Sequence, residues 1–146
     1  MRFWDSSALL PLISEETFSD TATNLLREDD EITAWWGTWI ECSVAISRLR
    51  REGRLNETDE EETRAALDRL AGNWIEQRPA DDMRLLASII SKDHPLKAAD
   101  ALQLVAALRW CEGDTVSAGF VCLDGRLRRA ATDEGFDVLP EPSEAG

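Results

Sequence analysis

The sequence predicts a single α/β domain whose parallel sheet is covered by helices on both faces. Short apolar segments of strand length alternate with longer segments in which apolar residues recur every three or four positions. The chain has 146 residues, the usual size of one domain, and 43% of them are hydrophobic, enough for a core. No linker rich in Gly, Ser or Pro divides it. This alternation of strands and helices is typical of a parallel sheet with both faces buried.

The first strand and the two helices after it are indicated by pattern and by capping residues. Residues 1–5 (MRFWD) are short, apolar and aromatic and end at an acid, which is typical of a buried strand. Ser6 and Ser7 can cap a helix that continues into the apolar residues beyond them. Apolar spacings of three and four predict a second helix over 18–26. An acidic turn then leads into a second strand over 31–35.

The middle of the chain predicts two helices followed by a strand. Residues 37–52 have one apolar side and end in arginines, which suit the negative end of a helix dipole, and Gly53 is a natural stop. Asn56 opens the next helix, which has acids in its first turn. Residues 74–78 indicate a short strand before Pro79.

The last third of the chain predicts three helices and two strands. A helix is expected over 81–90 and an alanine-rich one over 97–108, whose apolar breadth predicts packing on more than one side. The continuous apolar segment 119–123 is typical of a buried strand. A helix over 126–134 and a strand over 136–139 complete the pattern.

Domain limits, charge and cellular compartment follow from composition. One domain is expected over 1–140, with a frayed C-terminal tail over 141–146. Sixteen basic and 29 acidic residues give a net charge of −13, which excludes a histone-type nucleic-acid binder. No segment resembles a membrane span or a signal peptide, and Cys42, Cys111 and Cys122 read as buried thiols. We therefore expect a cytoplasmic protein with no membrane partner.

Four acids stand in apolar surroundings, where an ionised carboxylate is costly to bury. They are Asp5, Glu41, Asp100 and Asp124. Each alone has a simple structural explanation, because Asp5 and Asp124 can cap helices, Asp100 suits a first helical turn and Glu41 can face solvent. Asp5 and Asp124, however, both end expected strands. If those strands are neighbours, the two acids lie together at the edge where α/β sheets bind ligands.

Carboxylates that cluster in this way repel one another unless a cation lies between them. Mg²⁺ and Mn²⁺ are hard ions that favour carboxylate oxygens and water. The chemistry that follows is phosphodiester hydrolysis, in which one ion helps to generate the nucleophilic hydroxide and a second, if present, stabilises the leaving oxygen. Such chemistry requires no basic catalytic side chain, which suits a chain with one histidine and no tyrosine.

At these residues the sequence resembles the PIN-domain family of metal-dependent ribonucleases, and most closely the VapC-type toxins of toxin–antitoxin pairs. The opening FWDSSALLPLISEE is similar to the family's first strand with its metal-binding Asp, and TWIECSVAISRLRREG to its second motif. HPLKAADALQLVAALRW is similar to the Asp-Ala-Leu helix, although many relatives have histidine where this chain has Gln103. FVCLDGRLRRAATDEGFDVL resembles the last motif, with Cys122 at its hydroxyl position. A thiol is a weaker hydrogen-bond partner than a hydroxyl.

The resemblance implies a three-layer α/β/α fold with a central, mainly parallel sheet of four to five short strands. It implies that Asp5, Glu41, Asp100 and Asp124 are catalytic, and that Asp5, Asp100 and Asp124 bind the metal. Glu41 would bind directly or through water. Ser7 would orient Asp5 or a water molecule on the metal, and Cys122 would support the same corner. The implied activity is cleavage of RNA with Mg²⁺ or Mn²⁺, by a homodimer that a cognate antitoxin neutralises and that needs no nucleotide cofactor.

Arginines near the four acids are candidates for binding the RNA backbone, because the guanidinium fork suits phosphate. Arg48 follows Glu41 on its helix, and Arg126 and Arg128 follow Asp124. Their alternative role is to pair with the acidic surface of the chain itself. The alternative function is a catalytically silent PIN-like module that binds RNA or protein. An aspartyl phosphatase is disfavoured, because Asp5 lacks a second acid two residues later.

Overall fold

Five short parallel strands form the centre of the computed structural model, which describes residues 1–142. The strands are β1 (Arg2–Trp4), β2 (Thr33–Trp35), β3 (Ile75–Gln77), β4 (Gly119–Val121) and β5 (Asp137–Leu139). The helices are α1 (Ser6–Ile13), α2 (Ser19–Glu28), α3 (Thr38–Arg51), α4 (Glu57–Ala71), α5 (Asp82–Ile90), α6 (Ala98–Trp110) and α7 (Gly125–Asp133). The expected α/β class and the parallel sheet are confirmed.

The strand order is β3-β2-β1-β4-β5, so the chain builds outward from β1 and then returns to β1's other side. Phe3 is in register with Thr33 of β2 and with Phe120 of β4, which confirms that the first and fourth strands are neighbours. The direction of winding reverses between β1 and β4. In open α/β sheets such a reversal opens a crevice at the carboxyl ends of the two strands.

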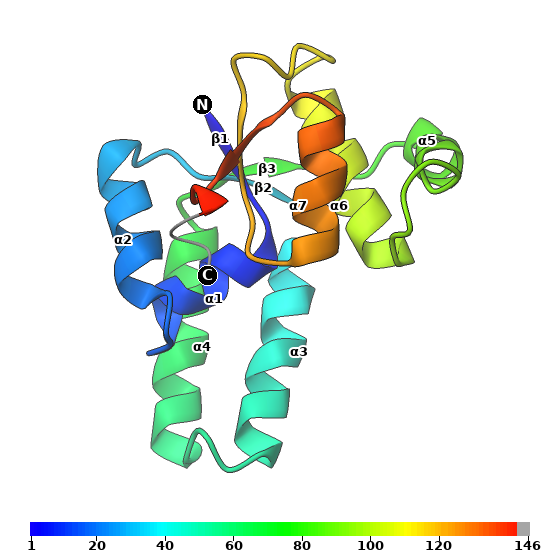
Figure 1. Cartoon of the computed structure of the whole chain (residues 1–146). Coiled ribbons are helices and arrows are strands. Elements are labelled where there is room, and N and C mark those ends of the chain that lie inside the picture. Colours follow the sequence, from blue (N-terminus) through cyan, green and yellow to red (C-terminus); the bar gives the residue numbers. More distant parts are fainter. Residues whose placement is uncertain (143–146) are drawn as a thin grey trace.

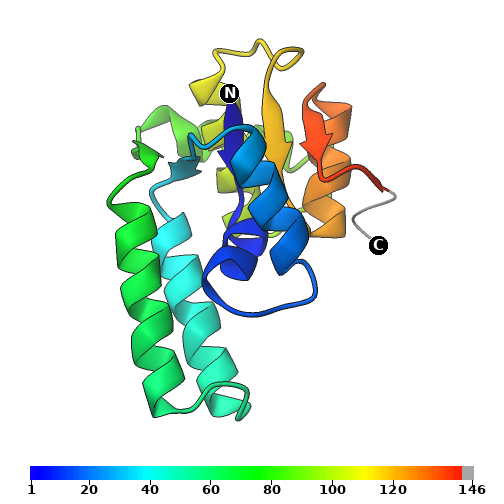
Figure 2. The ribbon, with the colours of Figure 1, turned by 90° about the vertical axis from the view of Figure 1, so that its left-hand side faces the viewer.

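Helices cover both faces of the sheet, as the handedness of parallel crossovers requires. Side chains that alternate along each strand divide the core into two parts. Phe3 and Phe120 pack with α6 and α7 on one face, whereas Trp4 and Val121 pack with α1 to α4 on the other. Figure 1 shows α7 and α6 on one side of the strands, and Figure 2 shows α2 and the α3–α4 pair on the other.

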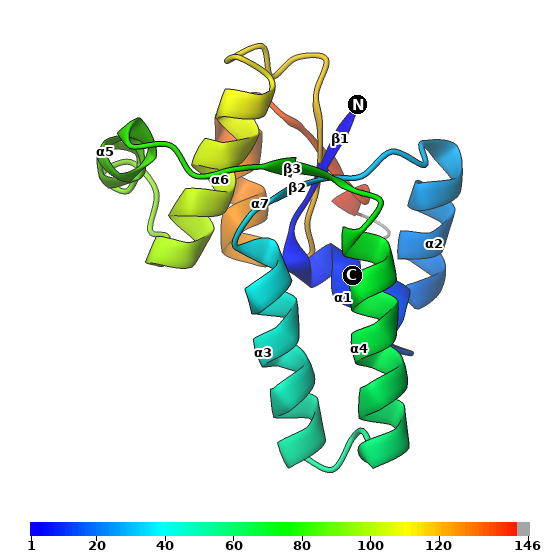
Figure 3. The same ribbon diagram turned by 180° about the vertical axis from the view of Figure 1, so that it is seen from behind.

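Helices α3 and α4 form a hairpin that projects well beyond the sheet (Figures 1 and 3). Arg64 joins the two helices by donating hydrogen bonds to Ser43 Oγ (2.9 Å) and Ser47 Oγ (2.8 Å). Asn56 and Asp59 form a capping box at the start of α4. On the opposite flank, buried His94 lies with Nε2 3.2 Å from Glu134 Oε2, so the turn after α5 is held to α7.

The expected elements agree with the structure to within a few residues, and one cap differs. Helix α1 begins at Ser6, and its N-cap is Asp5, not Ser6 or Ser7, because Asp5 Oδ2 accepts from the Ser7 amide. Up to Pro142, the chain forms one sheet with its covering helices. Residues 143–146 of the expected tail lie outside the described part. No helix within residues 1–142 is long and apolar enough to cross a membrane.

Candidate active site

Asp5 lies at the carboxyl end of β1, at the point where the winding of the sheet reverses. Its main-chain amide donates to Val121 O of β4 at 2.9 Å, so the residue is fixed between the two central strands. The side chain is only 3% exposed, and burial raises the pKa of its carboxyl group. Oδ2 caps α1, whereas Oδ1 is buried and has no hydrogen-bond partner among the described residues. That oxygen therefore lacks a partner of the kind that a bound cation would supply.

Ser7 and Cys122 both contact the Asp5 carboxyl group. Ser7 Oγ donates to Asp5 Oδ2 at 2.5 Å and accepts from the main-chain amide of Leu123 at 2.9 Å. The Cys122 thiol lies 3.6 Å from the same Asp5 oxygen. Burial raises the pKa of Cys122, and it raises that of Cys42 to about 12, so neither thiol is a nucleophile at neutral pH.

Glu41 projects from the first turn of α3 toward the same region and is half-buried. Burial and the charges of Asp5 and Asp100 together raise the pKa of its carboxyl group to about 7. The two oxygens have different partners. Ser6 Oγ donates to Oε1 at 3.2 Å, and Gln103 Nε2 donates to Oε2 at 3.3 Å. Glu41 is thus not a solvated helix-surface residue.

Asp100 and Asp124 complete the group from the other face of the sheet. Asp100 is half-buried in the first turn of α6, and its pKa is raised by burial and by the charges of Asp5 and Asp124, with Lys97 opposing. Asp124 is exposed and is the N-cap of α7, since Oδ2 accepts from the Leu127 amide at 3.0 Å. The capping roles of Asp5 and Asp124 are therefore real, and each leaves one carboxylate oxygen unused by the cap.

The four acids share one edge of the sheet without converging on a single point. The charges of Asp5 and Asp100 act on Glu41, and those of Asp5 and Asp124 act on Asp100. Within residues 1–142, however, no three His, Cys, Asp or Glu side chains lie close enough together to hold one metal ion. Like charges favour separated side chains when no cation lies between them. The donor set and the unpaired Asp5 Oδ1 suit a hard divalent cation, and coordination requires the outer side chains to turn inward.

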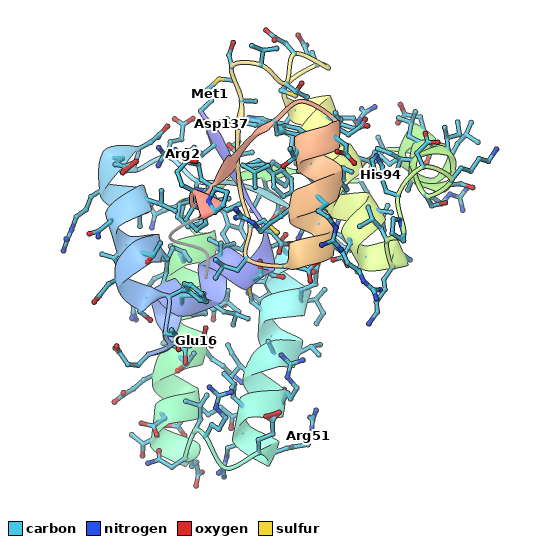
Figure 4. The ribbon with its side chains drawn as sticks, viewed as in Figure 1. Met1, Arg2, Glu16, Arg51, His94 and Asp137 are labelled. Carbon is cyan, nitrogen blue, oxygen red and sulfur yellow. The ribbon has the colours of Figure 1, made fainter. Side chains whose placement is uncertain are left out.

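The three arginines singled out from the sequence differ in their surroundings. Arg128 donates to Cys122 O and to Pro140 O, both at 2.8 Å, so its guanidinium joins α7 to the ends of β4 and β5. Arg48 is exposed on α3 and lies 3.9 Å from Glu52. Arg126 is exposed in the first turn of α7, next to Asp124. Arg51 lies at the far end of α3, away from the sheet (Figure 4).

Sequence reasoning missed three polar residues that contact or support Glu41. The sequence indicates Ser6 only as a helix cap and Gln103 only as a departure from a motif, and it does not single out Thr38; in the structure Ser6 and Gln103 contact Glu41, and Thr38 contacts Gln103. Gln103 had a usable signal, because it is an amide between Leu102 and Leu104 in a helix that is apolar on most sides. The reasoning that singled out four acids in apolar sequence applies equally to a buried amide.

Comparison with known proteins is informative only at the level of structure. No protein-family model matches the sequence, and no curated protein matches it significantly. Among solved structures, FitAcB from Neisseria gonorrhoeae matches with a TM-score of 0.67 and 15% identity, over 96% of this chain and 97% of that one. The five-stranded parallel sheet with its covering helices is thus a PIN-like three-layer fold. The resemblance found in the sequence is therefore confirmed for the architecture.

Two further solved structures share this fold. A toxin–antitoxin complex from Klebsiella pneumoniae matches with a TM-score of 0.57 and 17% identity, over 85% of this chain and 87% of that one. PAE2754 from Pyrobaculum aerophilum matches with a TM-score of 0.58 and 18% identity, over 88% of this chain and 78% of that one. Identities this low establish the common path of the chain, and the chemistry must be argued from the side chains.

Proposed function

We propose that this protein is a metal-dependent endoribonuclease and the toxin of a VapBC-type toxin–antitoxin pair. One observation carries the proposal: the buried, unpaired Asp5 Oδ1 lies at the reversal point of a PIN-like sheet, with Glu41 and Asp100 within reach of its charge. The toxin–antitoxin assignment is supported by the fold shared with a toxin–antitoxin complex from Klebsiella pneumoniae.

The electrostatics of the acids favour a bound cation. The pKa values of Asp5, Glu41 and Asp100 are all raised, which means that their ionised forms are under-stabilised by the chain alone. Mg²⁺ or Mn²⁺ would supply the missing positive charge and, when bound, would polarise the scissile phosphate and activate water. Asp5, Asp100 and Asp124 would hold it, with Glu41 acting directly or through water.

The remaining residues of the site orient these acids and the substrate. Ser7 and Cys122 fix one oxygen of Asp5, which leaves the other directed to the ligand. Glu41 is placed to hold a proton or a water molecule, because its pKa lies near neutrality. Among the three candidate arginines, Arg126 is best placed for the RNA backbone. It is exposed beside Asp124, and within residues 1–142 its guanidinium has no hydrogen bond like those that hold Arg128 to two main-chain carbonyls.

RNA cleavage by the purified protein, with Mg²⁺ or Mn²⁺ and with a chelator, tests the proposal. We expect cleavage only with metal, and its loss in Asp5→Asn and Asp100→Asn. Both substitutions are isosteric, so thermal unfolding should confirm that the variants fold. A silent PIN-like binding module is the alternative function. It would be indicated by wild-type protein that binds an antitoxin or RNA but does not cut RNA with either ion.

Two exposed apolar surfaces suit the two protein partners of the proposal. The α3 stripe, formed by Trp36, Ile40 and Val44, continues into the basic end of α3 and would suit an acidic partner segment such as one from an antitoxin. The α5 patch, formed by Leu85, Leu86 and Ile89, lies on a helix with one acid and one base. Because each chain has a net charge of −13, two copies repel each other least where the contact surface itself is neutral. We therefore assign the homodimer interface to the α5 patch.

A further inference from the structure

Gln103 is a fully buried amide that joins α6 to the start of α3. Its side chain has no exposed surface, and Nε2 donates to Thr38 Oγ1 at 2.8 Å and to Glu41 Oε2 at 3.3 Å. Thr38 is also fully buried. A glutamine amide has two N–H groups at a fixed angle, so one side chain can serve both acceptors at once. Its orientation is set by the shorter bond to Thr38.

We propose that Gln103 is a positioning residue that fixes the Glu41 carboxylate relative to the other acids of the site. The inference rests on the proposed nuclease function and assigns a role that the sequence motif leaves open. Gln103 lies three residues after Asp100, one turn along the same helix, so the amide and that acid share a face of α6. The contact therefore ties the position of Glu41 to that of Asp100.

Glu41 is held in the same way from the opposite side. Ser6, which donates to Oε1, is the residue after Asp5. One carboxylate oxygen of Glu41 is thus hydrogen-bonded to the helix that follows Asp5, and the other is hydrogen-bonded to the helix that carries Asp100. Two-sided bonding of this kind fixes both the place and the plane of a carboxylate, which is what an ordered site needs before substrate or metal arrives.

Packing alone does not account for an amide at this position. Gln103 Oε1 is buried and has no hydrogen-bond partner among the described residues. A buried carbonyl oxygen without a donor is costly, and a methionine of similar length would avoid that cost. The presence of an amide at this position is therefore better explained by the two hydrogen bonds that it donates, to Thr38 and Glu41, than by the space that it fills.

Gln103→Met tests the role by removing both donors while keeping the length of the side chain. Its matched control is Gln77→Met on β3, an edge strand outside the site. We expect Gln103→Met to lower kcat by about tenfold or more and to change KM for RNA by less than about twofold. We expect it to weaken Mn²⁺ binding by about tenfold, at the lower end of the range typical of lost outer contacts to metal ligands. Gln103→His, which keeps one ring donor, should recover part of the loss. Gln77→Met should change none of these values.

A double-mutant cycle separates positioning from a structural role. In the Glu41→Gln background, Gln103→Met should weaken Mn²⁺ binding no further, because the carboxylate that Gln103 orients is already absent. The same fractional loss in both backgrounds would overturn the proposal, as would wild-type kcat and Mn²⁺ affinity in Gln103→Met. If Gln103→Met does not fold, Thr38→Val provides the same test, because it removes the group that orients the Gln103 amide.

A measurement on the metal-free protein keeps this inference distinct from the proposed function. The side-chain amide signals of Gln103 can be assigned in ¹⁵N–¹H spectra by their loss in Gln103→Met. We expect Glu41→Ala to shift one of the two amide proton signals, because one N–H loses its acceptor. Unchanged signals would refute the contact. If the wild type neither binds Mn²⁺ nor cuts RNA, the nuclease proposal fails, and these signals still decide whether Gln103 orients Glu41.

Discussion

The Ser7 hydroxyl donates to Asp5 Oδ2 at 2.5 Å while it accepts a hydrogen bond from the Leu123 main-chain amide at 2.9 Å. One side chain thus links the acid at the end of β1 to the segment that follows β4. The link spans the reversal point of the sheet and leaves Asp5 Oδ1 as the free oxygen.

Removal of this hydroxyl should affect both stability and activity. Ser7→Ala leaves a buried carboxylate with fewer donors, so we expect a loss of about 1–3 kcal/mol in the free energy of unfolding, measured by urea denaturation. Metal-dependent RNA cleavage should also fall. Ser91→Ala is the matched control, since Ser91 Oγ also bonds at a helix end but is exposed. An equal effect of the two substitutions would contradict the role of Ser7.

Cys122 offers a test in which activity should be kept or increased. Cys122→Ser restores the hydroxyl typical of the resembling family and gives Asp5 a stronger donor, which stabilises the ionised carboxylate. We expect Mn²⁺ affinity at least equal to that of the wild type, measured by calorimetry. Cys122→Ala removes the donor and should weaken binding. Tighter binding by the alanine variant would show that the thiol does not assist Asp5.

The pKa of Glu41 near 7 predicts opposite pH effects on metal binding and on the stability of the metal-free fold. Protons compete with metal below that pKa, so Mn²⁺ affinity should fall by up to about tenfold per pH unit below pH 7. The folded-state pKa is raised above the ordinary value of 4.5, so the contribution of Glu41 to stability is full below pH 4.5 and is lost as the pH rises through 7.

Thermal unfolding at several pH values, in chelator, measures this second effect. We expect the metal-free protein to be more stable at pH 5.5 than at pH 8, by about 1–2 kcal/mol after allowance for the partial exposure of Glu41. Asp5 and Asp100 shift in the same direction and add to the trend. Glu41→Gln should reduce the pH dependence. A slope unchanged by that substitution would assign the effect to the other acids.

The arginines beside Asp124 should separate stability from substrate binding. Arg128→Ala removes two hydrogen bonds to main-chain carbonyls, so we expect it to lower the free energy of unfolding by about 1–3 kcal/mol. Arg126→Ala should leave unfolding within about 0.5 kcal/mol of wild type and raise KM for RNA, with a weaker dependence on salt. Equal stability losses in the two variants would place Arg126 in the fold instead of the RNA surface.

The two apolar surfaces can be tested by matched substitutions. Leu85 is 66% exposed and Val44 is 55% exposed, so aspartate at either position should leave the fold intact. We expect Leu85→Asp to shift the sedimentation of the isolated protein from dimer to monomer, and Val44→Asp to weaken the antitoxin complex only. Dimerisation lost through Val44→Asp instead would exchange the two assignments.

The path of the chain was predictable because its signals are local. The acid at the end of 1–5 and the apolar segment 119–123 predicted two strands that each end at an acid. The pairing of these strands, which brings Asp5 toward Asp124, is a long-range contact that only the structure shows. The partners of Glu41 were not predictable. The contact between Gln103 and Glu41 joins α6 to the start of α3, which are 62 residues apart in sequence. The bond from Arg128 to Pro140 O depends on where the chain runs after β5.

Asp5 and Asp124 each have two roles in the structure. One carboxylate oxygen caps the helix that follows, and the same carboxylate lies at the candidate site. Alanine at either position would remove an N-cap together with a proposed metal ligand, so a loss of activity could be confused with unwinding of the first helical turn. Asparagine keeps a capping oxygen. Substitution of both acids by asparagine is therefore the best way to make an inactive protein. Such a protein would serve for co-crystallisation with an inhibitor protein or for safe overexpression in a living host.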